Sequence, residues 1–256
     1  MGLKNKTAVI FGGSGAIGSA TARALAREGA DVYLAARTHA RLEQAASSIR
    51  AAGGSASTFV FDALEESSLL PDLARIDIVV NATGFMHDQG KRIEALTLGE
   101  FRQGFDPFLA AYFNIAKAVS SRMGGEHGGT IITVVAPAAN MAMASHLGHI
   151  VGCAGTEAFT RALAAELGTQ NIRVLCLRSH AIADAVQAGS YVGAIFTAKA
   201  QAMGITVGQF LGGAAQSTLT HRLPTLAQVA DTIAFLASDA ASAMTGTTVN
   251  MTAGAT

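Results

Sequence analysis

The chain has few cysteines and few charged residues. Of its 256 residues 2 are cysteine and 14% are charged, with 18 basic and 18 acidic side chains. Cys153 and Cys176 provide no disulfide framework, so we expect both thiols to be reduced. A formal net charge of zero offers no basic surface to nucleic acid or to anionic lipid. We therefore expect no nucleic-acid partner and no membrane partner, and we expect a small-molecule substrate.

Long apolar runs and linkers are also lacking. No stretch approaches the roughly 18 consecutive apolar residues of a membrane span, and the apolar run after residues 1–6 is too short for a secretory signal. These absences predict a cytoplasmic location. No Pro/Ser-rich linker, charge block or internal repeat divides the chain. Since 50% of the residues are hydrophobic, which is ample for a sizeable core, the sequence predicts one domain over residues 1–256.

The most informative pattern lies near the N-terminus, where residues 8–18 read Ala-Val-Ile-Phe-Gly-Gly-Ser-Gly-Ala-Ile-Gly. It predicts a short apolar strand, a glycine loop and a helix that runs to Gly29, and a second strand follows at residues 32–36. A side chain at Gly12 would block the tight turn, and Gly18 lets the helix pack close to the sheet. Free N–H groups at the helix start suit phosphates. The complete strand–helix–strand unit therefore predicts a cradle for a dinucleotide pyrophosphate.

Strand and helix patterns alternate along the rest of the chain. An amphipathic helix over residues 42–49 stops at a Gly-Gly pair, and two capping boxes, Thr97 with Glu100 and Thr225 with Gln228, open further helices. Such alternation predicts the α/β class, with a doubly wound, mostly parallel sheet of about seven strands and helices on both faces. Ligands then bind beyond the carboxyl ends of the strands. The predicted strands are Thr7–Phe11, Val32–Ala36, Ser57–Phe61, Ile76–Asn81, Thr130–Val135, Arg173–Leu177 and Thr247–Asn250.

Further motifs accompany the glycine loop: Asp62 after the third strand, Asn81-Ala82-Thr83-Gly84 after the fourth, and a C-terminal stretch over residues 228–250. With these in place the chain resembles the short-chain dehydrogenase/reductase family over essentially its whole length. The loop departs from the family's Thr-Gly-x-x-x-Gly-x-Gly at Phe11 and Ala16. The resemblance implies a single-domain Rossmann fold that binds a nicotinamide dinucleotide.

The resemblance also implies which residues contact that cofactor. Asp62 with Ala63 would contact the adenine, although Asp62 could instead cap the end of the strand. The segment from Asn81 to Gly84 would line the adenosine ribose. The full set that the resemblance implies is Gly12, Ser14, Gly15, Ala16, Ile17, Gly18, Arg37, Thr38, Asp62, Ala63, Asn81, Ala82, Thr83, Gly84 and Ile182.

The end of the second strand indicates which dinucleotide is preferred. An acidic residue there would bind the adenosine ribose hydroxyls and repel a 2′-phosphate. The sequence has Ala36 instead, followed by Arg37, which offers a forked cation, and Thr38, which offers a hydroxyl. This pattern predicts NADP(H) in preference to NAD(H). In the alternative interpretation Arg37 is simply a surface cation.

The family's four catalytic residues are a Tyr acid, a Ser that binds the substrate oxygen, a Lys beside the Tyr and an Asn that links the Lys to water. Aligning residues 128–136 with the family's fifth strand puts Ala136 at the Ser position. The family spacing then puts His149 at the Tyr position and Cys153 at the Lys position, and Phe108 stands for the Asn. None of the four positions holds the residue that the family has there. The cofactor half of the sequence therefore resembles the family, while the substrate half departs from it.

Three interpretations of this departure compete. In the first, the protein still transfers hydride to or from a small, apolar carbonyl, alcohol or imine, and His149 replaces Tyr as proton donor, because imidazole titrates near neutrality without a neighbouring Lys. In the second, which Ala136 and Phe108 favour, it binds NADP(H) or another ligand without redox turnover, and His149 has no catalytic role. In the third, His146, His149 and Cys153 bind a metal, although no acidic fourth ligand is evident. We favour the first and expect no metal.

The segment over residues 183–222 is the variable segment that covers the substrate in this family. Its apolar residues predict either a lid over a hydrophobic substrate or a core-packing helix. Three residues further upstream, Met141, Met143 and Leu147, would face the same pocket. The candidate lid residues are Tyr191, Val192, Ile195, Phe196, Met203, Phe210 and Leu211.

The expected oligomeric state rests on the family resemblance alone. The family commonly forms tetramers through two long helices, here Phe108–Met123 and Ile150–Leu167. Both contain enough Ala and Gly for close packing. We therefore expect a homo-oligomer, either a tetramer or a dimer.

Overall fold

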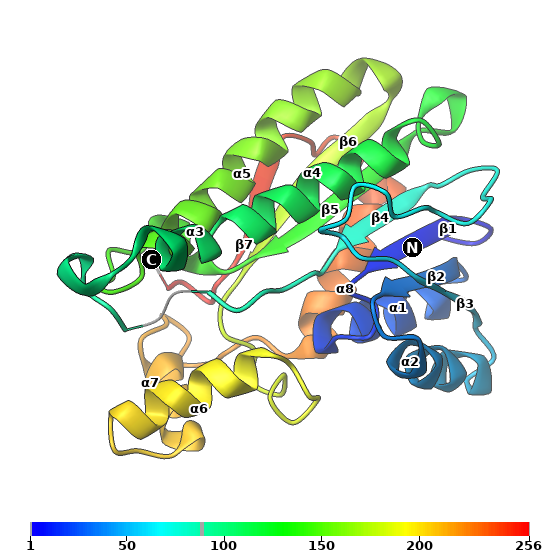
Figure 1. Cartoon of the computed structure of the whole chain (residues 1–256). Helices are drawn as coiled ribbons and strands as arrows, with labels where there is room; N and C mark the ends of the chain where they lie inside the picture. The colour runs from blue at the N-terminus through cyan, green and yellow to red at the C-terminus, as the bar shows by residue number, and fades with distance from the viewer. Residues whose placement is uncertain (1, 88–89, 256) are drawn as a thin grey trace.

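The computed structural model describes residues 2–87 and 90–255 of the chain. Strands and helices alternate along most of these residues (Figure 1), although β4 follows β3 with no described helix between them. The strands are β1 (Thr7–Phe11), β2 (Asp31–Ala36), β3 (Ser55–Val60), β4 (Ile78–Asn81), β5 (Gly129–Val135), β6 (Ile172–Ser179) and β7 (Thr247–Met251). The helices are α1 (Ala16–Arg27), α2 (His39–Ala51), α3 (Leu98–Gln103), α4 (Asp106–Ser120), α5 (Leu147–Leu167), α6 (Val192–Ala202), α7 (Val207–Gln216) and α8 (Leu226–Ala237).

The strands form one sheet in the order β3-β2-β1-β4-β5-β6-β7, with every described neighbour pair parallel. The order reverses direction between β1 and β4, which pair from Ala8 with Ile78 to Phe11 with Asn81. The doubly wound α/β fold of the sequence prediction is therefore confirmed. Ligands of such sheets bind at this reversal, beyond the carboxyl ends of the strands.

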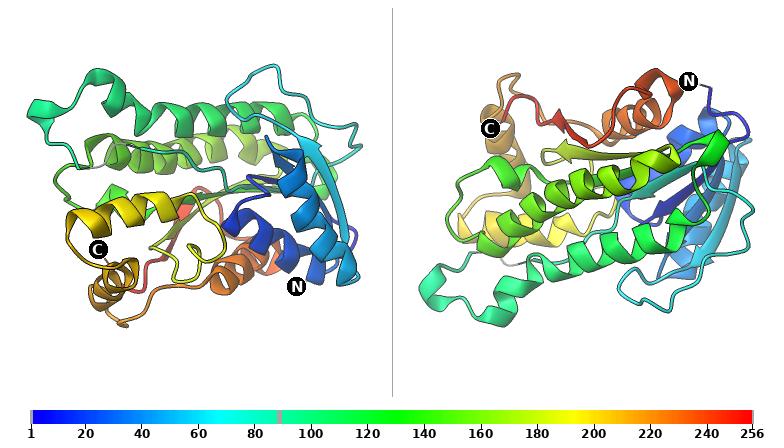
Figure 2. Two further views of the ribbon diagram at one scale, coloured as in Figure 1. Left: turned by 60° about the horizontal axis from the view of Figure 1, so that its bottom comes forward. Right: turned by 90° about the horizontal axis from the view of Figure 1, so that it is seen from above.

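Helices cover both faces of the sheet (Figures 1 and 2). Because side chains alternate along a strand, Ala8 and Ile10 of β1 pack in the core cluster under α1, α2 and α8, whereas Val9 and Phe11 pack under α4 and α5. Tyr112 of α4 is fully buried on this second face. Burial on both faces is what makes these strands continuously apolar.

The structure confirms the two capping boxes that the sequence predicts and contains a third. Thr97 with Glu100 and Thr225 with Gln228 form capping boxes at the starts of α3 and α8. Thr206 with Gln209 forms another at the start of α7. In Figure 1 α6 and α7 stand apart from the two helical layers. Within residues 2–87 and 90–255, no helix combines the length and the apolar character that crossing a bilayer requires.

The corner between β1 and α1 leaves no space for side chains at two glycines. Gly12 has φ +76°, and a Cβ there would lie 2.5 Å from the carbonyl oxygen of Ala82, beyond the end of β4. A Cβ on Gly18 would lie 2.2 Å from the carbonyl oxygen of Gly12. Both distances are too short for contact, so these two glycines hold the loop, the helix and β4 together.

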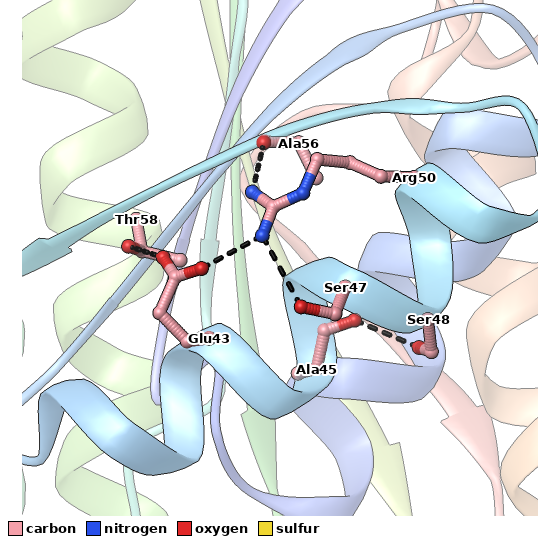
Figure 3. Close-up of polar contacts among 7 residues, drawn as sticks. All are labelled: Glu43, Ala45, Ser47, Ser48, Arg50, Ala56 and Thr58. Carbon is pink, nitrogen blue, oxygen red and sulfur yellow. Dashed lines mark hydrogen bonds and ion pairs between the residues drawn. The ribbon is translucent and has the colours of Figure 1, made fainter.

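Polar contacts fasten α2 to β3 (Figure 3). The guanidinium of Arg50 donates to the carbonyl of Ala56 at 2.9 Å, to the carboxylate of Glu43 at 2.7 Å and to the hydroxyl of Ser47. The hydroxyl of Thr58 donates to the other oxygen of Glu43. The carboxylate of Glu43 is therefore bonded to one side chain of its own helix, Arg50, and to one side chain of β3, Thr58.

We expect Gly18→Ala to lower the free energy of unfolding by about 2 kcal/mol, because the added methyl group overpacks the corner. Gly212→Ala is the matched control, since Gly212 lies inside α7 with open space around it and should gain about 0.5–1 kcal/mol. Urea unfolding followed by circular dichroism measures both. Equal effects of the two substitutions would contradict the tight corner.

Candidate functional site

Two cavities open at the carboxyl ends of the strands. The first, here the glycine-loop cavity, has a volume of about 230 Å³ and lies where the sheet order reverses. The second, here the histidine cavity, has a volume of about 280 Å³ and lies between β5, α5 and α6. The predicted cofactor residues that line the first are Gly12, Ser14, Gly15, Ala16, Ile17, Arg37, Thr38, Asp62, Ala63, Ala82, Thr83 and Gly84. Asn81 and Ile182 line the second.

The start of α1 suits an anion. Gly15 is its N-cap and provides no side-chain hydrogen bond, and the first turn has no acidic residue. The N–H groups of such a turn are left to water or to a ligand, and the helix dipole favours negative charge there. Gly12 and Gly18 keep this end clear of side chains. The residues present therefore fit a dinucleotide pyrophosphate.

Two cations line the far end of the glycine-loop cavity. Arg37 follows β2, and Arg41 lies in the first turn of α2. Neither takes part in any ion pair among the described residues. The nearby carboxylate of Glu43 is held instead by Thr58 and Arg50, which lower its pKa. Both guanidinium groups thus remain available to a phosphate.

The loops after β3 and β4 complete this cavity. Asp62 lines the cavity, and its Oδ1 accepts from the N–H of Leu64 at 3.0 Å. The sequence analysis gave a cofactor contact and a cap at the strand end as alternatives for Asp62, and its position is compatible with both. Oδ1 of Asn81 accepts from the N–H of Thr83 at 3.1 Å and from its hydroxyl at 2.7 Å. These bonds hold the segment from Asn81 to Gly84 in place.

The histidine cavity brings together the four positions where the family's catalytic residues are expected. Phe108, Ala136, His149 and Cys153 all line it. Phe108 packs edge-on against Phe85, with ring centroids 5.3 Å apart. An aromatic pair and a methyl group thus line the cavity at the two positions where the sequence analysis expects polar side chains of the family.

His149 lies in the first turn of α5 and stacks on His87, with ring centroids 3.8 Å apart and an interplanar angle of 8°. Burial, together with the electrostatic influence of His87, His146 and Lys199, lowers the pKa of His149 to about 3. The imidazole is therefore neutral at neutral pH. The sequence analysis expected it to titrate near neutrality; burial in the cavity is the physical reason for the difference.

Cys153 does not replace the charge of the family's Lys. Its Sγ lies 3.8–3.9 Å from the two ring nitrogens of His149, and burial raises the pKa of the thiol to about 12. A cation reaches the cavity from another element, because Lys199 of α6 places its Nζ 2.8 Å from Nε2 of His146. The positive charge therefore comes from the segment over residues 183–222.

That segment covers the histidine cavity. Tyr191, Val192, Ile195, Phe196 and Phe210 line it, as a lid would. Met203 does not, because it follows the last turn of α6 and is 63% exposed; Leu211 lies outside the lining too. Met141 and Met143 face the cavity, whereas Leu147 is exposed. Tyr191 reaches the β4 loop, where a Cβ on Gly84 would lie 2.1 Å from its ring.

Comparisons with known proteins agree with this geometry. A family model described as enoyl-(acyl carrier protein) reductase matches residues 13–256. The chain belongs to the short-chain dehydrogenase/reductase family. It is 31% identical to 2,3-dihydro-2,3-dihydroxybenzoate dehydrogenase of Bacillus subtilis, over 67% of this chain and 68% of that relative.

Solved structures of this oxidoreductase family have the same fold. A short chain dehydrogenase/reductase family protein superposes with a TM-score of 0.80 at 26% identity, covering 99% of this chain and 98% of the other. L-Sorbose reductase from Gluconobacter frateurii, solved with NADPH and L-sorbose, superposes with a TM-score of 0.86 at 24% identity. It covers 100% of this chain and 98% of the other. The short-chain dehydrogenase/reductase architecture is therefore retained from β1 to β7.

The metal interpretation finds no support in this family member. Among the described residues no group of three or more His, Cys, Asp or Glu side chains is arranged to hold a metal ion. His149 lies ring to ring with His87, and His146 bonds to Lys199. His146 and His149 thus contact residues outside the trio, and Cys153 lies against His149.

Sequence reasoning missed four residues that this short-chain dehydrogenase/reductase site contains: Arg41, His87, His180 and Lys199. Arg41 had a usable signal, since it lies one helical turn after Arg37. His180 directly follows β6, and its Nδ1 accepts from the N–H of Ala181 at 2.8 Å. His87 and Lys199 reach the cavity from segments far from His149 in sequence, so spacing could not reveal them.

The pKa of His149 predicts how stability depends on pH. Below pH 6.5 the unfolded imidazole binds a proton, while the folded one stays neutral until about pH 3. The unfolded state therefore binds more protons, and stability falls as pH falls. We expect His149→Phe to reduce this slope by up to about 1.4 kcal/mol per pH unit between pH 6 and 4. Urea unfolding by circular dichroism suits a chain without tryptophan. Identical slopes would contradict the buried neutral imidazole.

Proposed function

We propose that this protein is an NADP(H)-dependent oxidoreductase that transfers hydride to or from a small, apolar carbonyl, alcohol or imine substrate, with His149 handling the proton. One observation carries the proposal: the two cavities share the lining residues Ile17, Ala82, Thr83, Ser190 and Tyr191. We propose that together they form one cleft. It runs from the two arginines at one end to the imidazole at the other.

The cofactor assignment rests on charge and space along this cleft. The first turn of α1 would hold the pyrophosphate, and Arg37, Thr38 and Arg41 would hold a 2′-phosphate. No acidic side chain follows β2 to repel that phosphate, since Ala36 ends the strand. L-Sorbose reductase, which is similar in fold, was solved with NADPH. When bound, the nicotinamide supplies or accepts hydride.

The chain's own chemistry then concerns one proton. A neutral imidazole has one N–H donor and one acceptor nitrogen. The N–H of His149 would donate its proton to the substrate oxygen as negative charge develops there, while the other ring nitrogen takes up a proton from solvent, so that the ring stays neutral. In the reverse direction the nitrogen facing the substrate would take the alcohol proton while the other nitrogen releases one to solvent. The stacked ring of His87 restrains the orientation of His149. An iminium substrate, already protonated, needs this donor least.

A second candidate is a protein that binds NADP(H) or another ligand in the same cleft without redox turnover. The observation that favours it is the replacement of two polar positions by Ala136 and by Phe108, whose ring packs on Phe85. Neither side chain donates a hydrogen bond to a substrate oxygen. The experiment with His149 below separates the two candidates.

We also propose that the protein is cytoplasmic and forms a homo-oligomer, a tetramer or a dimer. The support for assembly is a shallow apolar groove between α4 and α5. Phe113 in this groove is 50% exposed, and small residues beside it permit close helix packing. The groove is lined by Leu109, Ala110, Phe113, Asn114, Gly155, Ala158, Phe159 and Ala162.

Removing the two arginines tests the cofactor preference. We expect Arg37→Ala and Arg41→Ala each to raise the Kd of NADPH by about 10-fold to 100-fold, the range of a lost hydrogen bond to a charged group. The Kd of NADH should stay unchanged, since it has no 2′-phosphate. Arg23→Ala, at an exposed position of α1, is the matched control. Isothermal titration measures all four proteins, and equal wild-type affinities for the two dinucleotides would contradict the preference.

Replacing the imidazole tests the reaction. With a panel of small ketones and imines, we expect His149→Phe to lower kcat/KM for NADPH oxidation by about 10²-fold to 10⁴-fold, the usual contribution of a positioned acid. The Kd of NADPH should not change. His127→Phe, at an exposed position, is the control. Unchanged turnover would remove His149 from the mechanism, and NADPH binding without any wild-type turnover would favour the second candidate.

A further inference from the structure

Within residues 2–87 and 90–255, the positive charge of Lys199 in the histidine cavity has no acidic partner. Among its described lining residues there is no Asp or Glu, and the one side chain with a formal charge at neutral pH is Lys199. No ion pair in the described part of the chain includes Lys199. The Lys199 side chain is half-buried, and burial lowers its pKa. A cation in this setting is stabilised by an anion that comes from outside the chain.

Among the described residues, the side chain of Lys199 forms a hydrogen bond with the imidazole of His146. Nδ1 of His146 lies 2.7 Å from the carbonyl oxygen of Ala144, which can only accept, so Nδ1 carries the proton. In the neutral ring Nε2 is then an acceptor, and Nζ of Lys199 donates to it at 2.8 Å. An ammonium group has three N–H donors. His146 thus orients Lys199 with one of them and leaves two for a ligand.

Several apolar side chains line the histidine cavity together with Lys199. Ile195, Phe196 and Lys199 recur at helical spacing, so that α6 presents all three to the cavity. Phe210 of α7 packs against Phe196, with ring centroids 5.4 Å apart. Met141 and Met143 line the same space. A ligand that fits this cavity has an apolar body and one negatively charged end.

We propose that the substrate of this site is an apolar oxo acid, or the corresponding hydroxy acid, whose carboxylate binds Lys199 while its carbonyl or alcohol group faces His149. The inference rests on the proposed function for the identity of the reacting group, and on the cavity for the carboxylate. A carboxylate is favoured over a phosphate because the cavity supplies one cation, which a monoanion balances. A charge-assisted bond between ammonium and carboxylate is stronger than a neutral hydrogen bond. Lys199 is a specificity-determining residue in this assignment.

The test uses a panel of oxo acids with four to ten carbons, straight and cyclic, such as 4-oxocyclohexanecarboxylate, each paired with its methyl ester. Isothermal titration measures their binding to the full chain saturated with NADP⁺ and, separately, without it. The variants are Lys199→Met, which removes the charge, and Lys199→Arg, which keeps it. Lys4→Met, at the exposed N-terminal side of β1, is the matched control for loss of a lysine.

We expect at least one acid to bind the wild type about tenfold more tightly than its ester, which is about 1.4 kcal/mol. Lys199→Met should abolish that preference without changing ester binding, whereas Lys199→Arg and Lys4→Met should keep it. The inference is overturned if no acid in the panel is preferred over its ester, or if Lys199→Met keeps the preference. Because binding is measured without turnover, acid binding through Lys199 with no NADPH oxidation would contradict the proposed function alone. Turnover of ketones with no preference for acids would contradict this inference alone.

Discussion

The close approach of the glycine loop to β4 is the constraint on which the rest of the site depends. Gly12 turns out of β1 with its Cα hydrogen against the carbonyl of Ala82, and Gly18 brings α1 against Gly12. This contact brings the start of α1 to the carboxyl ends of β1 and β4, where the sheet order reverses. The cleft exists because these three elements meet there without side chains between them.

The charge at the two ends of the cleft comes from different parts of the fold. The arginines near the glycine loop are presented by the end of β2 and by α2, which Arg50 fastens to β3. The groups at the other end come from the β4 loop, the start of α5 and α6. His87 and Lys199 thus reach the histidine cavity from outside β5 and α5. Apolar enclosure keeps the imidazole of His149 neutral, so its chemistry depends on burial.

Most of the fold could be predicted from the sequence, because the signals are local. Strand β1 ends where its apolar run ends, at Phe11, and Thr97 and Thr225 cap helices through residues three positions away. The cofactor side of the site follows for the same reason, since it lies in three loops that directly follow strands. The other side does not. The stacking of His87 on His149, the contact of Lys199 with His146 and the pKa of His149 all depend on which distant segments meet, and no spacing within the chain encodes that.

The central claim is that hydride and proton move within one cleft, from a dinucleotide held beside Arg37 to a substrate beside His149. The most direct measurement is deuterium transfer: NADPH deuterated at the transferable C4 position is incubated with the protein and a mixture of small ketones, oxo acids and imines, and the products are analysed by mass spectrometry. The account predicts a reduced product that carries one deuterium on the carbon of the former carbonyl or imine. NADPH that binds tightly yet passes no deuterium to any member of the mixture would contradict it.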